Sequence, residues 1–234
     1  MTSVQQMLLV ALVASLAGCE ASKDAAARSA PEAAASPLPT TEPTTVSAAT
    51  DTRKVIVVVG DSISAGYGLN RGQSFPDDLQ RKLDEAKKPW RVVNQGISGD
   101  TTAGGASRIA VTLNAMPNVV LLELGGNDGL RGMPWASTKE NLEKMIQTYQ
   151  KAGAQVVLAG MSLPPNYGAD YIKRFEQTYK ELAAKYKIKL IPFLFSDMIT
   201  PDLRYFQPDG IHPTAEGAEI VAGTVMKALE PLLK

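Results

Sequence analysis

The chain has 234 residues, of which 44% are hydrophobic and 21% charged, and its formal net charge is zero. This length predicts one sizeable domain, and the basic residues form no stripe, so we do not expect a nucleic-acid partner. There is one cysteine, Cys19, and one histidine, His212. These counts exclude an internal disulfide and a thiolate zinc cluster, and we expect no metal site. Any chemistry that needs an imidazole must use His212.

Residues 1–18 have the features of a bacterial signal peptide. Met7–Leu16 is a run of apolar or small residues, close in length to a signal-peptide core and far short of a membrane-spanning helix. It leads into Leu16-Ala17-Gly18-Cys19, which resembles a lipobox. The resemblance predicts cleavage before Cys19 and lipidation of its thiol. An ordinary secretory signal with an incidental cysteine is the alternative, and no Lys or Arg precedes the apolar run.

Residues 19–52 consist largely of Ala, Ser, Thr and Pro in irregular order. Their apolar surface is too sparse to offset the entropy of ordering, so we expect a flexible tether. A lipidated Cys19 would attach this tether to a membrane. Glu20 follows the cysteine in place of Asp, which favours the periplasmic side of the outer membrane. The folded domain is expected over residues 53–234.

Apolar runs and helical patterns alternate five times within residues 53–234. The runs, which predict buried strands, are Lys54–Val59, Arg91–Val93, Val119–Leu124, Gln155–Leu158 and Lys189–Ile191. The helical patterns cover Ser74–Ala86, Thr101–Met116, Ser137–Ala152, Tyr171–Tyr186 and Thr214–Leu233. This alternation predicts an α/β fold in which a five-stranded parallel sheet has helices on both faces. Ligands of such folds bind at the carboxyl ends of the strands.

The segment Gly60–Gly68 follows the first predicted strand and contains Ser62. A serine between glycines, just past a buried strand, can hold its hydroxyl at the carboxyl end of the sheet with its backbone N–H free. A simple turn and a phosphate-binding loop are the alternatives. The segment lacks the Gly-Lys-Ser/Thr of a Walker loop and the pattern GxGxxG. This turn alone is weak support for catalysis.

Two hydrogen-bond donors are expected after the next two strands. Gly99 has no side chain, so its backbone N–H can approach a ligand closely. The alternative role of this segment is capping of the next helix by Asp100 or Thr101. Asn127, within Gly125–Gly129, can donate its amide N–H to an oxyanion, an interaction worth on the order of 3 kcal/mol when well placed. A tight turn is the alternative there.

The last candidate segment is Pro208–Thr214, which contains Asp209 and His212. The two residues lie three positions apart in a turn fixed by Gly210 and two prolines. Asp209 can hydrogen-bond one ring nitrogen and leave the other to take a proton from Ser62. A lone histidine is more often structural, but this one is the only imidazole of the chain and lies at an element boundary. Ser, Asp and His in this order predict an acyl-transfer site.

These segments resemble the four conserved blocks of the SGNH (GDSL) hydrolase family. The nucleophile, glycine, asparagine and acid–base blocks are matched by Gly60-Asp61-Ser62, Gly99, Gly125-Gly126-Asn127-Asp128 and Asp209-Gly210-Ile211-His212-Pro213. Three further stretches resemble the periplasmic thioesterase/lysophospholipase/arylesterase branch of the family: Ser98–Thr102, Glu123–Gly132 and Leu163–Gly168. The resemblance extends from about Lys54 to the C-terminus.

The resemblance implies a flavodoxin-like three-layer α/β/α sandwich that needs no metal or cofactor. Ser62, Asp209 and His212 would be catalytic, and the oxyanion hole would consist of the backbone N–H groups of Ser62 and Gly99 with the Asn127 side chain. The implied substrates are acyl thioesters, aryl or short- to medium-chain acyl esters, and lysophospholipids. Residues expected to flank the acyl pocket are Leu130, Met133, Trp135, Leu163, Pro164 and Tyr167.

Two other functions stay open at this point. A polysaccharide or peptidoglycan O-acetyl esterase would use the same catalytic residues, although Leu130, Met133, Trp135 and Leu163 favour an apolar acyl chain over a sugar. A lipoprotein that binds a ligand with a decayed active site is the other alternative. The retention of every reactive position argues against it.

Overall fold

The computed structural model describes residues 51–234. The predicted signal peptide, the lipobox with Cys19 and nearly all of the predicted tether lie outside the described residues.

The five predicted strands form one parallel sheet, which confirms the predicted fold class. The strands lie in the order β2-β1-β3-β4-β5. Their bounds are β1 Lys54–Gly60, β2 Trp90–Gly96, β3 Val119–Glu123, β4 Gln155–Ala159 and β5 Lys189–Ile191. Because the strand order reverses beside β1, the carboxyl end of this strand is the position at which such sheets bind ligands.

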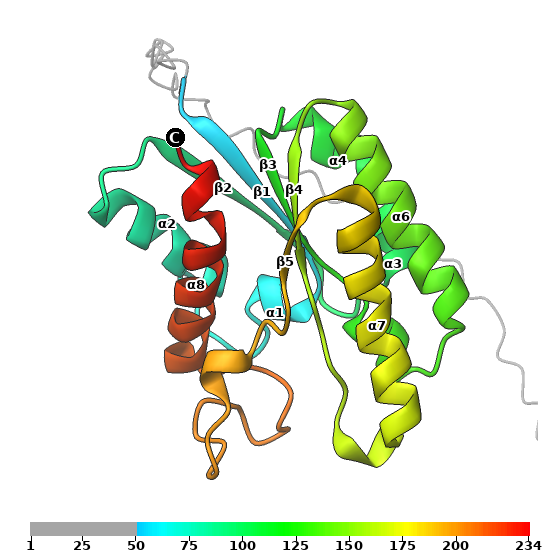
Figure 1. Ribbon diagram of the computed structural model, residues 1–234. Helices are drawn as coiled ribbons and strands as arrows, with labels where there is room; N and C mark the ends of the chain where they lie inside the picture. Colours follow the sequence, from blue (N-terminus) through cyan, green and yellow to red (C-terminus); the bar gives the residue numbers. More distant parts are fainter. Residues whose placement is uncertain (1–50) are drawn as a thin grey trace, which may run out of the picture. The chain divides into compact units, whose positions relative to one another are not determined.

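Helices cover both faces of the sheet (Figure 1). One face carries α2 (Phe75–Glu85) and α8 (Ala215–Leu229), which pack against each other. The other carries α3 (Thr102–Ser107), α4 (Ile109–Asn114), α6 (Trp135–Lys151) and α7 (Ala169–Tyr186). Short 3-10 helices lie at Pro165–Tyr167, Ser196–Met198 and Glu230–Leu232. The result is the expected three-layer sandwich.

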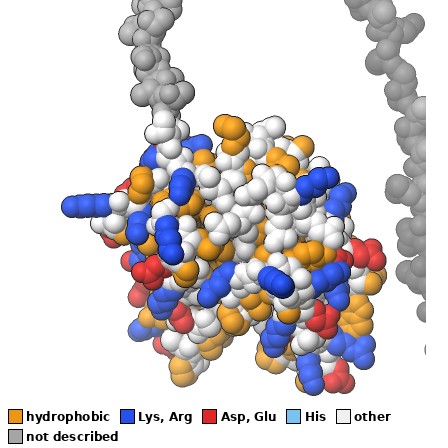
Figure 2. All heavy atoms as spheres, turned by 45° about the horizontal axis from the view of Figure 1, so that its top comes forward, with side chains coloured by type: hydrophobic (Ala, Val, Ile, Leu, Met, Phe, Trp, Pro, Cys, Tyr) orange, Lys and Arg blue, Asp and Glu red, His pale blue; other side chains and the backbone are white. Residues whose placement is uncertain are grey.

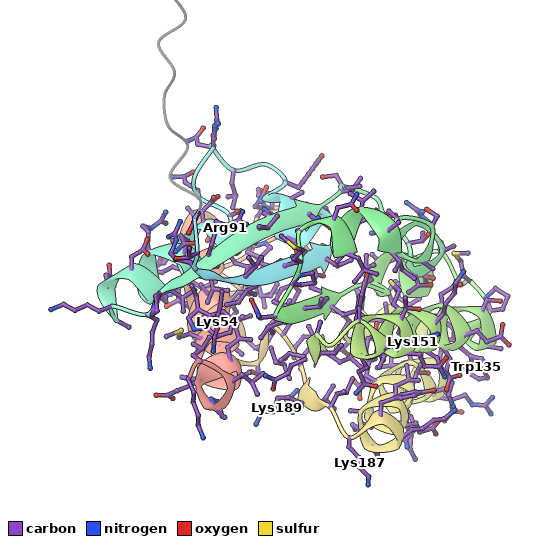
Figure 3. The ribbon with its side chains drawn as sticks, turned by 90° about the horizontal axis from the view of Figure 1, so that it is seen from above. Lys54, Arg91, Trp135, Lys151, Lys187 and Lys189 are labelled. Atoms are coloured by element: carbon purple, nitrogen blue, oxygen red, sulfur yellow. The ribbon has the colours of Figure 1, made fainter. Side chains whose placement is uncertain are left out.

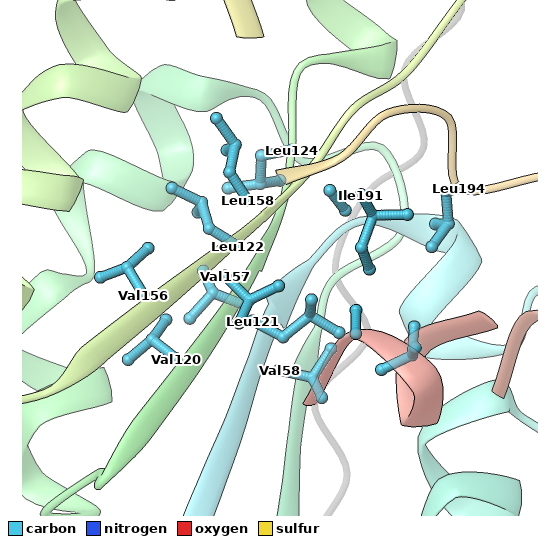
Figure 4. Packing of buried hydrophobic residues seen from close by; sticks show 14 of the residues in the cluster. Val58, Val120, Leu121, Leu122, Leu124, Val156, Val157, Leu158, Ile191 and Leu194 are labelled. Atoms are coloured by element: carbon cyan, nitrogen blue, oxygen red, sulfur yellow. The ribbon is translucent and has the colours of Figure 1, made fainter. Parts of the chain in front are cut away.

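The core lies in and around the central strands. The side chains of β3 are all buried, and none of its five residues has exposed surface. Strands covered on both faces are expected to be continuously apolar. Figure 4 shows Val120, Leu121 and Leu122 of β3 packed among Val156, Val157 and Leu158 of β4. This packing fixes the strand ends from which the candidate site residues project.

One predicted helix, Thr101–Met116, is interrupted in the structure. It consists of α3 and α4, which meet at Arg108, where the backbone leaves the helical conformation (φ −108°, ψ 19°). The Arg108 guanidinium binds the Asp100 carboxylate and the Gly60 carbonyl oxygen at the end of β1. This side chain therefore ties the helix break to the carboxyl end of the sheet.

Two short helices that were not predicted follow β1 and β3. They are α1 (Ser62–Ala65) and α5 (Gly126–Leu130). Both segments are rich in glycine and turn-forming residues, so the sequence pattern indicated loops. Each helix begins at the carboxyl end of its strand and carries one candidate site residue, Ser62 or Asn127.

The surface carries charges of both signs. On the face shown in Figure 2, Lys and Arg side chains are scattered among acidic, hydrophobic and uncharged ones. Within residues 51–234, no helix combines the length and the hydropathy needed to cross a membrane.

Candidate active site

Ser62 is the first residue of α1 and lies just past the end of the strand β1. Asp61 caps this helix, because its Oδ1 accepts a 3.0 Å hydrogen bond from the backbone N–H of Ile63. The helix ends at Gly66, whose φ of 74° lies in the left-handed region that glycine adopts without strain. The Ser62 hydroxyl is thus held at the carboxyl end of the sheet.

His212 and Asp209 lie on the loop before α8, and their side chains form a hydrogen-bonded chain with Ser62. Nε2 of His212 lies 2.9 Å from Oγ of Ser62, and Nδ1 lies 2.7 Å from Oδ2 of Asp209. A carboxylate can only accept a hydrogen bond, so the ring proton resides on Nδ1. Nε2 then carries a lone pair directed at the serine hydroxyl.

The turn around Asp209 keeps its side chain ionised. Its Oδ1 accepts hydrogen bonds from the backbone N–H groups of Ile211 (2.9 Å) and His212 (3.0 Å). Burial opposes ionisation, but these bonds and the His212 ring outweigh it and lower the pKa of Asp209 to about 2. The group beside the imidazole is therefore a carboxylate at neutral pH.

A fourth side chain, Gln207, joins the loops that carry Ser62 and His212. Its Nε2 donates to the backbone oxygens of Tyr67 (2.7 Å) and Pro213 (2.8 Å). The Tyr67 ring packs against the imidazole, with ring centroids 4.5 Å apart. These contacts restrict the orientation of the His212 ring relative to α1.

The three expected oxyanion donors face one cavity. Ser62, Gly99 and Asn127 all line it. In the part of the chain that the structure describes, no hydrogen bond engages the backbone N–H of Ser62 or Gly99. Gly99 has a φ of 80°, so a side chain at this position would strain the backbone. Thr101 caps α3, so helix capping and a free Gly99 N–H occur together.

Two charged neighbours orient the Asn127 amide. Its Nδ2 donates to Oδ2 of Asp61 at 3.1 Å, while its Oδ1 lies 3.4 Å from Nη2 of Arg131. An acceptor on one side and a cationic donor on the other fix which end of the amide carries the N–H₂ group. One N–H of Nδ2 is used by Asp61, and the other is free to donate to a ligand.

The cavity beside Ser62 has a volume of about 740 Å³. Of the residues expected to flank it, Leu130, Leu163 and Pro164 line its wall. Most of its remaining apolar lining comes from the segments that follow β4 and β5: Met161, Phe193, Phe195, Ile199, Leu203, Phe206 and Ile211. Few polar groups apart from the candidate catalytic ones face this space.

Three residues expected at the pocket do not line it. The Trp135 ring stacks on the Arg174 guanidinium, 4.7 Å from its centroid, and Figure 3 shows Trp135 at the outer side of α6 and α7. The Tyr167 hydroxyl donates to the carbonyl oxygen of Leu130 at 2.8 Å, so it contacts the backbone of a residue that lines the cavity. Met133 lies on the connection between α5 and α6, where its backbone N–H donates to the carbonyl oxygen of Asp128.

The aromatic part of the pocket wall was not predicted from the sequence. Phe195 packs edge-to-face on both Phe193 and Phe206, with ring centroids 5.7 and 5.6 Å apart. The available signal was a segment rich in apolar residues, 192–206, that has neither strand nor helix periodicity and follows the last strand. Apolar residues in a loop at the carboxyl end of a sheet indicate a binding wall.

The assembled groups fit covalent acyl transfer. The site combines a hydroxyl in contact with an imidazole, a carboxylate that orients the imidazole, and donors beside the hydroxyl. The adjoining apolar cavity is of a size that ligand sites commonly have.

Known proteins resemble this chain over most of the described residues. The sequence model of the GDSL-like lipase/acylhydrolase family matches residues 58–220. The chain is 44% identical to esterase TesA of Pseudomonas aeruginosa over 77% of its length and 90% of the relative's. It is 36% identical to thioesterase 1/protease 1/lysophospholipase L1 of Escherichia coli K12, over 80% of the chain and 86% of the relative. A crystal structure of TesA superimposes with a TM-score of 0.73 and 43% identity, over 77% of this chain and all of that one.

Proposed function

The chain belongs to the GDSL-like lipase/acylhydrolase family, and we propose that Ser62, His212 and Asp209 make it a serine hydrolase that cleaves carboxylic esters and thioesters through an acyl-enzyme. Its relatives named esterase TesA and thioesterase 1/lysophospholipase L1 support this reaction class. The observation that carries the proposal is the continuous hydrogen-bonded chain from the Ser62 hydroxyl through His212 to Asp209.

Acylation begins with attack of the Ser62 Oγ on the substrate carbonyl carbon. Nε2 of His212 accepts the serine proton, and the imidazolium that forms is stabilised by the Asp209 carboxylate, which does not itself take up the proton. The carbonyl oxygen becomes negatively charged in the same step. The backbone N–H groups of Ser62 and Gly99 and the free N–H of Asn127, three residues that line the cavity, would stabilise it.

The acyl-enzyme then forms and is hydrolysed. Nε2 of His212 passes its proton to the departing alcohol or thiol as the tetrahedral intermediate collapses, which leaves the acyl group on Ser62. A water molecule that enters the vacated space gives its proton to the same nitrogen and attacks the acyl carbon. Collapse of the second intermediate returns the proton to Ser62 and releases the acid.

The cavity lining favours an apolar acyl group over a sugar. Phe193, Phe195 and Leu163 contribute apolar surface and no donor for sugar hydroxyls, and each buried methylene contributes roughly 0.8 kcal/mol to binding. A series of p-nitrophenyl esters tests this assignment. We expect kcat/KM to rise from acetate to medium chain lengths. An enzyme that accepts acetate and fails beyond about four carbons would instead be an O-acetyl esterase.

A serine-directed phosphonate tests the mechanism itself. We expect stoichiometric labelling at Ser62, and no labelling and no hydrolysis of p-nitrophenyl butyrate by Ser62→Ala, whose fold should be unchanged. A ligand-binding protein with a decayed site would not be labelled. Undiminished turnover by the Ser62→Ala variant would rule out the proposed nucleophile.

We also propose that the enzyme is exported and carries a lipid on Cys19, which would attach it to the outer membrane on the periplasmic side. The lipobox sequence Leu16-Ala17-Gly18-Cys19 supports this proposal. Metabolic labelling with palmitate in a bacterial host tests it. The full-length chain should incorporate label and fractionate with membranes, and Cys19→Ala should do neither. A wild-type chain that is exported but carries no label would show that the signal is an ordinary secretory one.

A further inference from the structure

Glu123 is a buried carboxylic acid that the mechanism above does not use. It is the last residue of β3, whose four preceding residues are all apolar, and its side chain has no exposed surface. Buried carboxyl groups are costly unless they are hydrogen-bonded or protonated. The hydrogen bonds of Glu123 to residues around α1 indicate a structural role for this buried side chain.

The Glu123 carboxyl holds the residues on both sides of the nucleophile. Its Oε2 accepts a 2.5 Å hydrogen bond from the Ser64 hydroxyl and a 3.3 Å bond from the backbone N–H of Asp61. Ser64 is itself fully buried. Ser62 therefore lies between two anchor points that share one oxygen atom of Glu123.

Gly60 provides the space for this contact. A Cβ added at Gly60 would collide with Oε2 of Glu123 and with Oγ of Ser64. Any other residue at the end of β1 would thus push the carboxyl group away from α1. In this chain, glycine is therefore required at position 60 for a steric reason, because a side chain there would occupy the space of the Glu123 carboxyl group.

The same contacts extend to the oxyanion donor. Glu123 holds the backbone of Asp61, and the Asp61 side chain accepts hydrogen bonds from Ile63 and from Nδ2 of Asn127. A displacement of Asp61 would shift Ser62 and release Asn127 together. In active sites, misplacement by about 1 Å can lower the rate on the order of 100-fold.

We propose that Glu123 is a positioning residue of the hydrolytic site, which sets the placement of the Ser62 nucleophile through Asp61 and Ser64 and of the Asn127 donor through Asp61. This inference rests on the proposed function of Ser62 and assigns Glu123 no contact with substrate.

The charge state of the pair supports this role. Burial, followed by the nearby Asp61 carboxyl, raises the pKa of Glu123 well above its usual range. Burial also raises the pKa of Asp61, but hydrogen bonds from Ile63 and Asn127 favour its charged form. Among the described residues, Oε1 of Glu123 has no hydrogen-bond partner, and leaving an oxygen of a charged carboxylate unpaired in the interior is highly unfavourable. Burial and the unpaired oxygen both favour the neutral form of Glu123.

Two substitutions at Glu123 test the proposal on the full chain. Glu123→Gln keeps a neutral acceptor of nearly the same shape, so kcat for p-nitrophenyl butyrate should stay within about threefold of wild type. Glu123→Ala removes the acceptor, and kcat should fall on the order of 10- to 100-fold with little change in KM. Leu142→Ala, which truncates a fully buried core residue of α6, is the control for lost stability. It should lower Tm while leaving kcat per folded molecule unchanged.

The possible results distinguish a failure of this inference from a failure of the proposed function. If wild type is active and labelled at Ser62, but Glu123→Ala retains full kcat, the inference is wrong and the serine mechanism stands. An equal loss of kcat in Glu123→Gln and Glu123→Ala would also overturn the inference, because the site would then need a charged carboxylate at position 123. Should Glu123→Ala fail to fold, Ser64→Ala removes one of the two contacts and should still lower kcat, by a smaller factor, with KM unchanged. An unaltered kcat in that variant would count against the proposal.

Discussion

Nε2 of His212 lies 2.9 Å from Oγ of Ser62, although 150 positions separate the two residues in the chain. Ser62 follows the strand β1, whereas His212 precedes the last α-helix, α8. The contact exists because every strand of the parallel sheet ends on the same side, so the loops that follow them converge there. The Gln207 side chain then joins the two loops.

The carboxylate of Asp209 should be required for rate and not for substrate binding. In Asp209→Asn, the amide can present its carbonyl or its N–H₂ to Nδ1, and the latter drives the ring to the tautomer whose proton is on Nε2 and cannot accept the Ser62 proton. We expect kcat to fall on the order of 1,000- to 10,000-fold, with KM changed little. Steady-state kinetics with p-nitrophenyl butyrate measures both. A loss confined to KM would show that Asp209 shapes the binding site instead.

Asp209 should also contribute to stability in mildly acidic solution. Its pKa is lowered from 3.8 to about 2 in the folded protein, so folding favours the ionised form. The contribution is complete above the unfolded pKa and is lost as the pH falls through the folded value. Between about pH 5 and pH 2, Tm should therefore fall more steeply for wild type than for Asp209→Asn. If Tm falls equally with pH in the two proteins, the hydrogen bonds assigned to the Asp209 carboxylate are contradicted.

Asn127 should act on the transition state. Asn127 lines the cavity beside Ser62 and has one N–H that Asp61 does not use, and removal of one oxyanion donor costs roughly 100- to 1,000-fold in kcat. We expect Asn127→Ala to show this loss with an unchanged KM for p-nitrophenyl butyrate. The matched control is Asn114→Ala, at the exposed end of α4, which should behave as wild type. If Asn127→Ala retains wild-type kcat, the oxyanion is held by other donors.

The sequence was sufficient to predict the sheet, because strands buried on both faces leave continuous apolar runs such as Val119–Leu122. The contacts of His212 with Ser62 and with Asp209 were also predictable, since each residue follows a strand or precedes a helix. The walls of the pocket were harder to predict. Phe195 and Leu203 lie in a segment without periodicity, and their direction depends on tertiary packing that no local pattern encodes.

Glu123 illustrates a different difficulty. A single acidic residue at the end of an apolar strand is an anomaly that the sequence does display. Its partners, however, are Ser64 and the backbone of Asp61, which lie 59 and 62 positions away along the chain. Only the register of β1 against β3, which pairs Gly60 with Glu123, brings them together.

Leu203 should help to select longer acyl chains. It lines the cavity, is 47% exposed, and has a φ of 51°, a left-handed conformation that a leucine rarely adopts. Such strain at a binding site is maintained only where the surrounding structure holds it. Leu203→Ala removes apolar surface that an acyl chain of about eight carbons would cover, worth about 1 kcal/mol at a half-exposed position.

We expect kcat/KM of Leu203→Ala for p-nitrophenyl octanoate to fall about fivefold, which corresponds to that free energy, and kcat/KM for the acetate ester to stay unchanged. Val111→Ala, which truncates an exposed residue of α4 outside the cavity lining, is the control and should alter neither value. Because an acetyl group is too short to cover the Leu203 side chain, only a residue that supports the whole loop would affect both substrates. Equal losses with both esters would therefore mean that Leu203 holds the loop in place and does not contact the acyl chain.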